Sequence, residues 1–200
     1  MNRDAASADM AYIRDVMRRT QARIDTHSFH SVHWGAIVLV WYPLANWFCS
    51  HERYDVSLAL TIGCAVAGGL FSAVREIRLR GRPRLDGVNT FIADQVKLIT
   101  AFCIGAGLFF TFVGPPLGIL DRAATAVVWG LTYAVLAFML GVVYTREYLY
   151  AGVAILAGSV LALIQPQHMG YILGPFMGLG LMIPGLMGER RVKRLAAGHD

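Results

Sequence analysis

Six long apolar runs follow one another along the chain, separated by short polar breaks. A helix that crosses the hydrocarbon core of a bilayer needs roughly 20 predominantly apolar residues. We therefore expect an all-α fold, a polytopic membrane protein built as a bundle of six transmembrane helices preceded by a short amphipathic cytoplasmic helix. The pattern predicts the six spans at residues 33–49, 56–74, 98–113, 123–144, 148–164 and 169–187.

The polar and apolar pattern divides the chain into three parts. Residues 1–30 form a cytoplasmic amphipathic N-terminal helix, because apolar residues such as Ile13 and Val16 recur at helical spacing among arginines and aspartates. This helix can lie on the membrane surface or on a partner, or dock on the protein's own helices. Residues 31–188 form the six-span transmembrane domain, and residues 189–200 form a basic cytoplasmic tail.

The basic residues alternate from one polar break to the next. Of the eighteen Lys and Arg residues, fifteen lie in the N-terminal region, the second break, the fourth break and the tail. Arg53 and Arg122 lie on the other breaks, and Lys97 lies at a boundary. Because short loops rich in Lys and Arg stay cytoplasmic, we expect a multi-pass protein of the cytoplasmic (inner) membrane with both termini in the cytoplasm.

The composition agrees with this reading. With 56% hydrophobic and 16% charged residues, six spans leave no room for a catalytic domain outside the membrane. The net charge of +5 does not indicate nucleic acid, because the arginines lie next to spans and not on one soluble face. We expect the second break to contact anionic lipid headgroups or a protein partner through five arginines: Arg75, Arg78, Arg80, Arg82 and Arg84.

Three histidines form the densest group of coordinating side chains. His27, His30 and His33 are spaced by three residues at the start of the first span, so they can share one helix face. Such a face could bind a transition metal or ligate haem. The alternative is that these imidazoles lie at the headgroup level, like the neighbouring Trp34. Nothing else in the sequence identifies a cofactor.

The last span has an unusual content of glycine and proline. Gly170, Gly174 and Gly178 repeat every four residues, which predicts close helix packing, either within the bundle or at the face of a homo-oligomer. Pro175 and Pro184 each remove a backbone hydrogen bond. We expect these prolines to bend the helix, and they are candidate hinges.

Charged residues are missing from the middle of the predicted spans, which argues against ion-coupled transport. The polar residues within the spans are Asn46, Thr100, Thr132, Tyr133 and Ser159. No nucleophile, phosphate-binding or metalloprotease motif occurs, so we assign no catalytic residue. The sequence therefore leans against an enzyme.

Short motifs lie near both ends of the chain: Tyr12-Ile13-Arg14 and Met17-Arg18-Arg19 before the first span, and Gly170-Tyr171 and Pro184-Gly185 in the glycine-rich last helix. With these motifs, the chain resembles a group of uncharacterised bacterial six-helix inner-membrane proteins. The resemblance implies a bacterial inner-membrane location and the six-helix layout. It implies no activity, since the group has none established.

These observations leave three functional hypotheses. The leading one is a non-enzymatic accessory, regulatory or scaffold component of the cytoplasmic membrane, with a protein partner or a second copy of the chain as possible contacts. The second is a small-solute transporter or channel with a cavity between kinked helices, lined by Asn46, Thr132, Tyr133 and the proline-broken sixth span. The third is a metal-binding or haem-binding membrane protein that uses the three histidines.

Overall fold

The computed structural model describes residues 7, 9–16, 28–80, 91–114 and 117–197. Every regular element in these ranges is helical, which confirms the all-α class. Residues 9–16 form a helix within the predicted N-terminal amphipathic segment, whose remainder up to residue 27 lies largely outside the described residues. The other elements are α2 (Phe29–Ser50), α3 (Tyr54–Arg80), α4 (Phe91–Val113), α5 (Arg122–Val143), α6 (Arg146–Ile164), the short 3-10 helix η1 (Pro166–His168) and α7 (Met169–Ala197).

Five stretches are long and apolar enough to cross a membrane, so the chain is a multi-pass membrane protein. They are Tyr54–Arg78, Gln95–Val113, Ala124–Val143, Arg146–Ile164 and Pro166–Arg191. The 22-residue α2 has sufficient length but is not among the five. Its sequence includes His33, Pro43 and Asn46, which enter hydrocarbon less favourably than Leu, Ile or Val.

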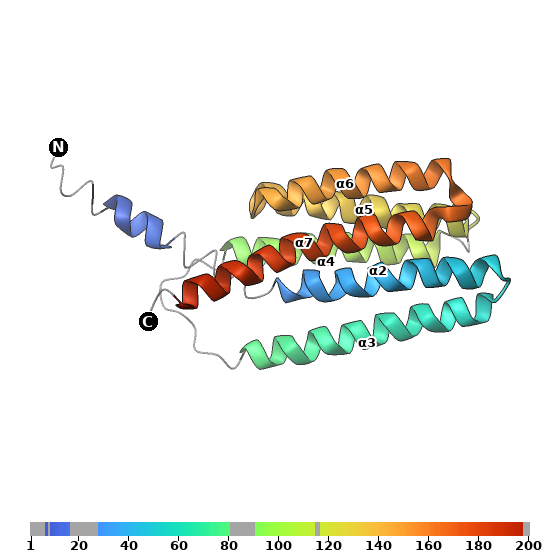
Figure 1. The fold of residues 1–200 in the computed structure, drawn as a ribbon, viewed down its shortest axis with the longest axis horizontal. Helices are drawn as coiled ribbons and strands as arrows, with labels where there is room; N and C mark the ends of the chain where they lie inside the picture. Colours follow the sequence, from blue (N-terminus) through green and yellow to red (C-terminus); the bar gives the residue numbers. More distant parts are fainter. Residues whose placement is uncertain (1–6, 8, 17–27, 81–90, 115–116, 198–200) are drawn as a thin grey trace.

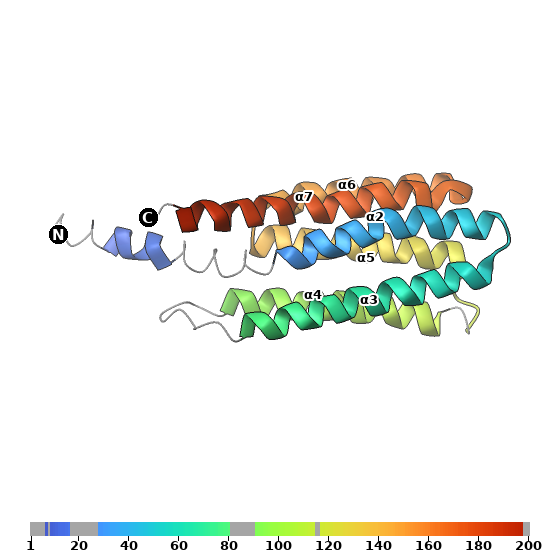
Figure 2. The same ribbon diagram turned by 60° about the horizontal axis from the view of Figure 1, so that its bottom comes forward.

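Helices that follow each other in the chain run in opposite directions through the bundle (Figures 1 and 2). The most extensive contact joins α2 to α7, the first and last helices of the bundle, and α7 also packs against α6 and α5. The α3 helix packs mainly on α2, and α4 packs mainly on α5. The centre of the bundle is therefore made by α2, α5, α6 and α7, while α3 and α4 lie at its periphery.

The α2 and α7 helices meet through the glycine repeat. A Cβ atom added to Gly174 would lie 2.7 Å from Cδ of Pro43, and one added to Gly178 would lie 2.7 Å from Cβ of Leu39. Only residues without a side chain allow two helix backbones to approach this closely. The repeat is thus buried against α2 of the same chain.

Asn46 joins the same two helices by hydrogen bonds. Its side-chain oxygen accepts from the backbone N–H of Gly170 at 3.0 Å, and its side-chain N–H donates to the carbonyl of Gln167 at 3.2 Å. The Gly170 N–H belongs to the first turn of α7, where helical N–H groups have no partner within their own helix. Asn46 of α2 therefore supplies a hydrogen-bond acceptor to the first turn of α7.

Tryptophan and threonine attach α3 to α2. The ring of Trp34 covers Gly68, where an added Cβ would lie 2.9 Å from the ring atom Cη2. Nearby, the indole N–H of Trp41 donates to the Thr61 hydroxyl at 3.0 Å. That hydroxyl in turn donates to the carbonyl of Ser57 at 2.8 Å, which satisfies both groups inside the apolar bundle.

The same arrangement attaches α4 to α5. The ring of Trp129 covers Gly107, where an added Cβ would lie 2.7 Å from the ring atom Cζ3. The indole N–H of Trp129 donates to the Thr111 hydroxyl at 2.8 Å, and this hydroxyl donates to the Gly107 carbonyl at 2.8 Å. Each peripheral helix is thus held by two kinds of contact. A tryptophan ring of the neighbouring central helix covers one of its glycines, and a tryptophan indole N–H of that central helix donates to one of its threonine hydroxyls.

We predict that Gly174→Leu destabilises the protein by about 1–3 kcal/mol, because the new side chain would overlap Pro43. The matched control is Gly63→Leu on α3, where an added Cβ would have no heavy atom within 4 Å. Thermal unfolding in detergent measures the effect, and size exclusion with light scattering reports the oligomeric state. A dimer that Gly174→Leu dissociates without loss of stability would contradict the intramolecular role of this glycine.

Candidate functional site

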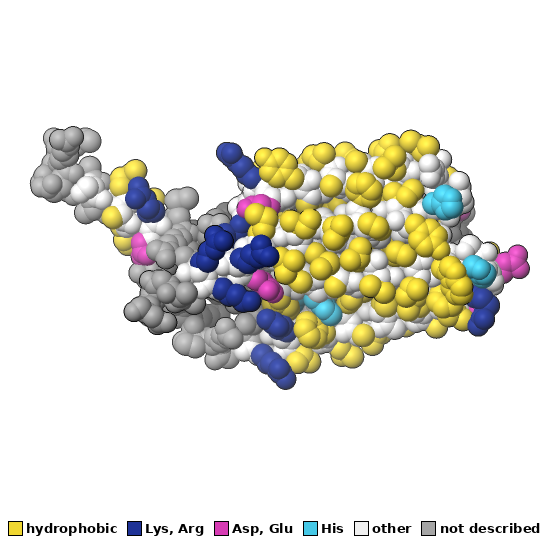
Figure 3. All heavy atoms as spheres, in the orientation of Figure 1, with side chains coloured by type: hydrophobic (Ala, Val, Ile, Leu, Met, Phe, Trp, Pro, Cys, Tyr) yellow, Lys and Arg dark blue, Asp and Glu magenta, His cyan; other side chains and the backbone are white. Residues whose placement is uncertain are grey.

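The charged side chains gather at the two ends of the bundle, and the ends differ in sign (Figure 3). One end, where α2 begins and α3 finishes, is rich in described cationic side chains: Arg75, Arg78, Lys97, Arg146, Arg190, Arg191, Lys193 and Arg194. The opposite end has a single described arginine and several carboxylates: Arg53, Glu52, Asp55 and Asp121. We call the first the basic end and the second the acidic end.

A polar cluster connects three helices at the basic end. His30 of α2 lies 3.2 Å from the Ser72 hydroxyl through Nδ1, and its Nε2 lies 3.6 Å from Oε2 of Glu76 on α3. The ammonium group of Lys97 on α4 lies 3.9 Å from the other carboxylate oxygen of Glu76. We call these four residues the basic-end cluster. Within this cluster, the pair of Glu76 and Lys97 links α3 to α4.

Sequence spacing predicts a different partner for Lys97, namely Asp94 three residues earlier on the same helix. In the structure Lys97 pairs with Glu76 of α3, and the side chain of Asp94 lies outside the described residues. The sequence shows Glu76 only as a lone carboxylate beside an arginine-rich break. Its contacts with α2 and α4 depend on how the helices are arranged, which local spacing does not reveal.

The three candidate metal ligands have different surroundings. His30 belongs to the basic-end cluster, whereas the ring of His33 stacks on Phe71 with centroids 4.2 Å apart. The Nε2 atom of His33 is buried without a hydrogen-bond partner in the described part of the chain. His27 lies outside the described residues. Within those residues no group of three or more His, Cys, Asp or Glu side chains could hold a metal ion. Metal or haem binding by the trio therefore stays the alternative hypothesis that the sequence leaves open.

The predicted arginine surface is described in part. The guanidinium of Arg75 lies over the Phe29 ring, 4.4 Å from its centroid, so this arginine is a link between α3 and α2. Arg78 is exposed. Arg80 ends α3 but its side chain is not described, and Arg82 and Arg84 lie outside the described residues. Of the five, Arg75 and Arg78 have described side chains, and both are exposed.

A second ion pair at the basic end joins the last helix to α6. Arg191 donates from Nη1 to Oε1 of Glu147 at 2.9 Å, and both side chains are about three-quarters buried. The predicted tail begins at Glu189, and its described part up to Ala197 is the last portion of α7. The pair holds the start of this segment against the start of α6.

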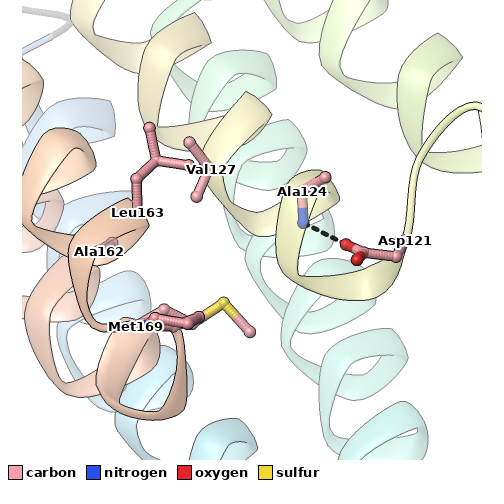
Figure 4. A pocket seen from close by; sticks show the side chains of 7 residues that line it. Asp121, Ala124, Val127, Ala162, Leu163 and Met169 are labelled. Carbon is pink, nitrogen blue, oxygen red and sulfur yellow. Dashed lines mark hydrogen bonds between the residues drawn. The ribbon is translucent and has the colours of Figure 1, made fainter.

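A hollow with a volume of about 210 Å³ opens at the acidic end, between the start of α5, the end of α6 and the start of α7 (Figure 4). It is lined mainly by apolar side chains, including Val127, Leu163 and Met169. The carboxylate of Asp121 lies at its edge, where Oδ1 accepts from the backbone N–H of Ala124 at 2.7 Å and caps α5. This carboxylate is therefore used in the fold.

A second hollow, with a volume of about 320 Å³, lies between α4 and α5 and is lined largely by apolar residues such as Phe102, Phe110 and Leu131. Thr132 contributes the hydroxyl on its wall, and this hydroxyl donates to the carbonyl of Val128 at 2.8 Å. Tyr133, its neighbour in sequence, packs against the buried core. Neither hollow is a polar chamber.

The residues proposed to line a transport cavity do not meet at one place in the described structure. Asn46 bonds to the start of α7, Thr132 lies on the hollow between α4 and α5, and Tyr133 lies against the core. The candidate hinges Pro175 and Pro184 both lie inside α7, which runs as one helix from Met169 to Ala197. The role of these prolines as hinges during a functional cycle stays a prediction.

Fold and charge together define the class: a helical multi-pass membrane protein with one basic end and an apolar bundle. Comparison with protein families, curated proteins and solved structures finds no match to this chain. The function must therefore be argued from the residues themselves.

We predict that the protein purified without a histidine tag contains no stoichiometric transition metal or haem. The reason is that His30 already contacts Ser72 and Glu76, and His33 stacks on Phe71. Elemental analysis and the absorption spectrum measure this, with His30→Ala as the matched variant. Bound metal or haem that is lost in His30→Ala would establish the metal hypothesis instead.

Proposed function

We propose that the chain crosses the bilayer six times, with α2 as the crossing helix additional to the five apolar ones, and that the basic end faces the cytoplasm. Two observations support this. The 22-residue α2 lies along α7, which is itself apolar enough to span. The described Lys and Arg side chains gather at the end shared by the start of α2 and the finish of α7, as expected for a cytoplasmic side.

We further propose that the protein is a non-enzymatic accessory, regulatory or scaffold component of a bacterial cytoplasmic membrane, as in the six-helix proteins that its motifs resemble. One observation carries this proposal. Polar side chains inside the bundle, such as Asn46, Trp41 and Trp129, are engaged in contacts between helices, whereas most of the described exposed Lys and Arg side chains lie at the basic end. The surface available to partners is thus the basic end.

The contacts proposed for the basic end are anionic headgroups and a protein partner or second copy of the chain. Arg78, Lys193 and Arg194 are exposed there and can reach phosphate groups or acidic side chains. The transporter hypothesis has less support, because its three lining residues lie in separate surroundings.

The six-span topology predicts which single-cysteine variants react with a reagent that stays outside the cell. In a background without Cys49, Cys64 and Cys103, we expect a membrane-impermeant maleimide to label His51→Cys in intact cells. Met10→Cys and Lys193→Cys should react only after permeabilisation. Labelling of Met10→Cys together with His51→Cys in intact cells would show that α2 does not cross the bilayer.

The scaffold proposal predicts contacts at the basic end and not at the acidic end. A photo-crosslinking amino acid at Arg78 should capture one reproducible protein or anionic lipid in native membranes, and the same group at Arg53 should not. Mass spectrometry identifies the adduct. The proposal would lose its basis if the protein is a monomer and the group at Arg78 gives no adduct. It would also lose its basis if the groups at Arg78 and Arg53 give equal amounts of adduct.

A further inference from the structure

The start of α6 and the end of α7 lie side by side at the basic end. The two helices pack together and run in opposite directions (Figure 1). Glu147 in the first turn of α6 and Arg191 near the end of α7 face each other, with Oε1 and Nη1 2.9 Å apart. This ion pair therefore marks the line of contact between the two helices at the basic end.

The two arginines that precede this pair lie on the same side of the contact. Arg146 comes directly before Glu147, and Arg190 comes directly before Arg191. One step along an α-helix turns the side chain by about 100°. Because both helices are right-handed and run in opposite directions, the two turns lead to the same side. Both arginines are exposed, and neither forms an ion pair with another described residue.

On α6, this side continues toward the middle of the helix as an exposed apolar face. Tyr150, Val153 and Ala157 follow Arg146 at steps of four, three and four residues, so they share its side of the helix. Tyr150 and Val153 are 74% and 57% exposed, and Ala157 is exposed as well. The Tyr150 phenol lies one turn from Arg146, at the depth where membrane proteins place tyrosines beside lipid headgroups.

On α7, the same side has a matching row of side chains. Ile183, Met187, Arg190 and Arg194 are also spaced by four, three and four residues. Ile183 and Met187 are 54% and 38% exposed, and Arg194 is exposed without an ion pair to a described residue. We call the two rows together the α6–α7 face. It has three arginines at its basic end and exposed apolar side chains along the rest.

The arginines of this face lie at the depth of lipid phosphates and keep their charge uncompensated. The apolar stretch of α6 begins at Arg146, and that of α7 ends at Arg191, so both mark the end of a span. The Glu147 carboxylate is paired with Arg191. Glu189 comes directly before Arg190 and is therefore turned a further 100° or so away from α6. The face thus has a net positive charge where a membrane lipid has its phosphate.

We propose that the α6–α7 face binds diphosphatidylglycerol (cardiolipin), a lipid that has two phosphates in one molecule. This inference rests on the proposed contact of the basic end with anionic headgroups. The Arg146 guanidinium holds one phosphate, Arg190 and Arg194 hold the other, and acyl chains lie along the apolar side chains of both helices. The axes of packed helices are about 8–10 Å apart, so arginines on two helices match two linked phosphates better than one.

The test compares the anionic lipids that stay bound to the full-length protein. The protein is reconstituted in phosphatidylethanolamine with diphosphatidylglycerol and phosphatidylglycerol in amounts that supply equal numbers of phosphates. It is then extracted in mild detergent and analysed by native mass spectrometry. We expect diphosphatidylglycerol to be retained in preference to phosphatidylglycerol. Equal retention per phosphate would overturn this inference but leave the wider contact with anionic headgroups standing, and retention of neither lipid would overturn both.

Variants of the two helices locate the site. Arg146→Met and Arg190→Met should each lower the retention of diphosphatidylglycerol about two- to fivefold, toward that of phosphatidylglycerol, as expected for the loss of one exposed ion pair. The matched control is Arg78→Met, which removes an exposed cation of the same end from α3 and should leave the retention unchanged. Equal losses in Arg146→Met and Arg78→Met would show a general attraction to the basic end and would overturn the specific site.

Thermal unfolding in detergent gives a second measurement and checks that the variants fold. Without added lipid, Arg146→Met should unfold at the same temperature as the unchanged protein, because Arg146 has no ion pair to lose within the described structure. Diphosphatidylglycerol should raise the unfolding temperature of the unchanged protein more than that of the variant, since a ligand stabilises the state that it binds. An equal rise with inorganic phosphate would show that the face binds the free anion, and the lipid assignment would be wrong.

Discussion

The bundle depends on the close approach of its first and last helices. Gly174 and Gly178 allow the backbone of α7 to approach Pro43 and Leu39 of α2 within van der Waals contact. In a bilayer the association of helices gains little from the hydrophobic effect, because lipid chains are as apolar as leucine. Tight packing must supply the free energy instead, and glycines let the two helix backbones approach each other closely. The other central helices then pack around this pair.

The contacts between helices include buried polar groups, and nearby side chains and backbone carbonyls make their hydrogen bonds. The tryptophan indoles of α2 and α5 find threonine hydroxyls on α3 and α4, and those hydroxyls also bond to their own helix. An unsatisfied N–H in hydrocarbon would cost several kcal/mol, so these bonds define which face of each peripheral helix turns inward. Among the described residues, the remaining faces of α3 and α4 have few contacts with other helices, and the apolar windows of both helices are only 11% buried.

Sequence periodicity and charge located the helices well, because a span requires a long apolar run and a basic flank. All six predicted runs are helical, and the described Lys and Arg side chains gather at one end. The partners of individual residues were not predictable in this way. Lys97 forms an ion pair with Glu76 of another helix, because its neighbours are set by the order of helices around the bundle. The same holds for the glycine repeat, whose spacing fits an internal partner and a second copy equally well.

The bond between Asn46 and Gly170 has a consequence for synthesis and insertion. These residues are 124 positions apart, so α2 leaves the ribosome long before its main partner exists. Until α7 arrives, the α2 face with Gly35, Leu39 and Asn46 must be sheltered by lipid, by α3 or by an insertion factor. Assembly is therefore a late event of high contact order, completed only when the chain closes on itself. A ribosome stalled before the last helix would leave α2 in the membrane without the α7 partner of the Asn46 amide.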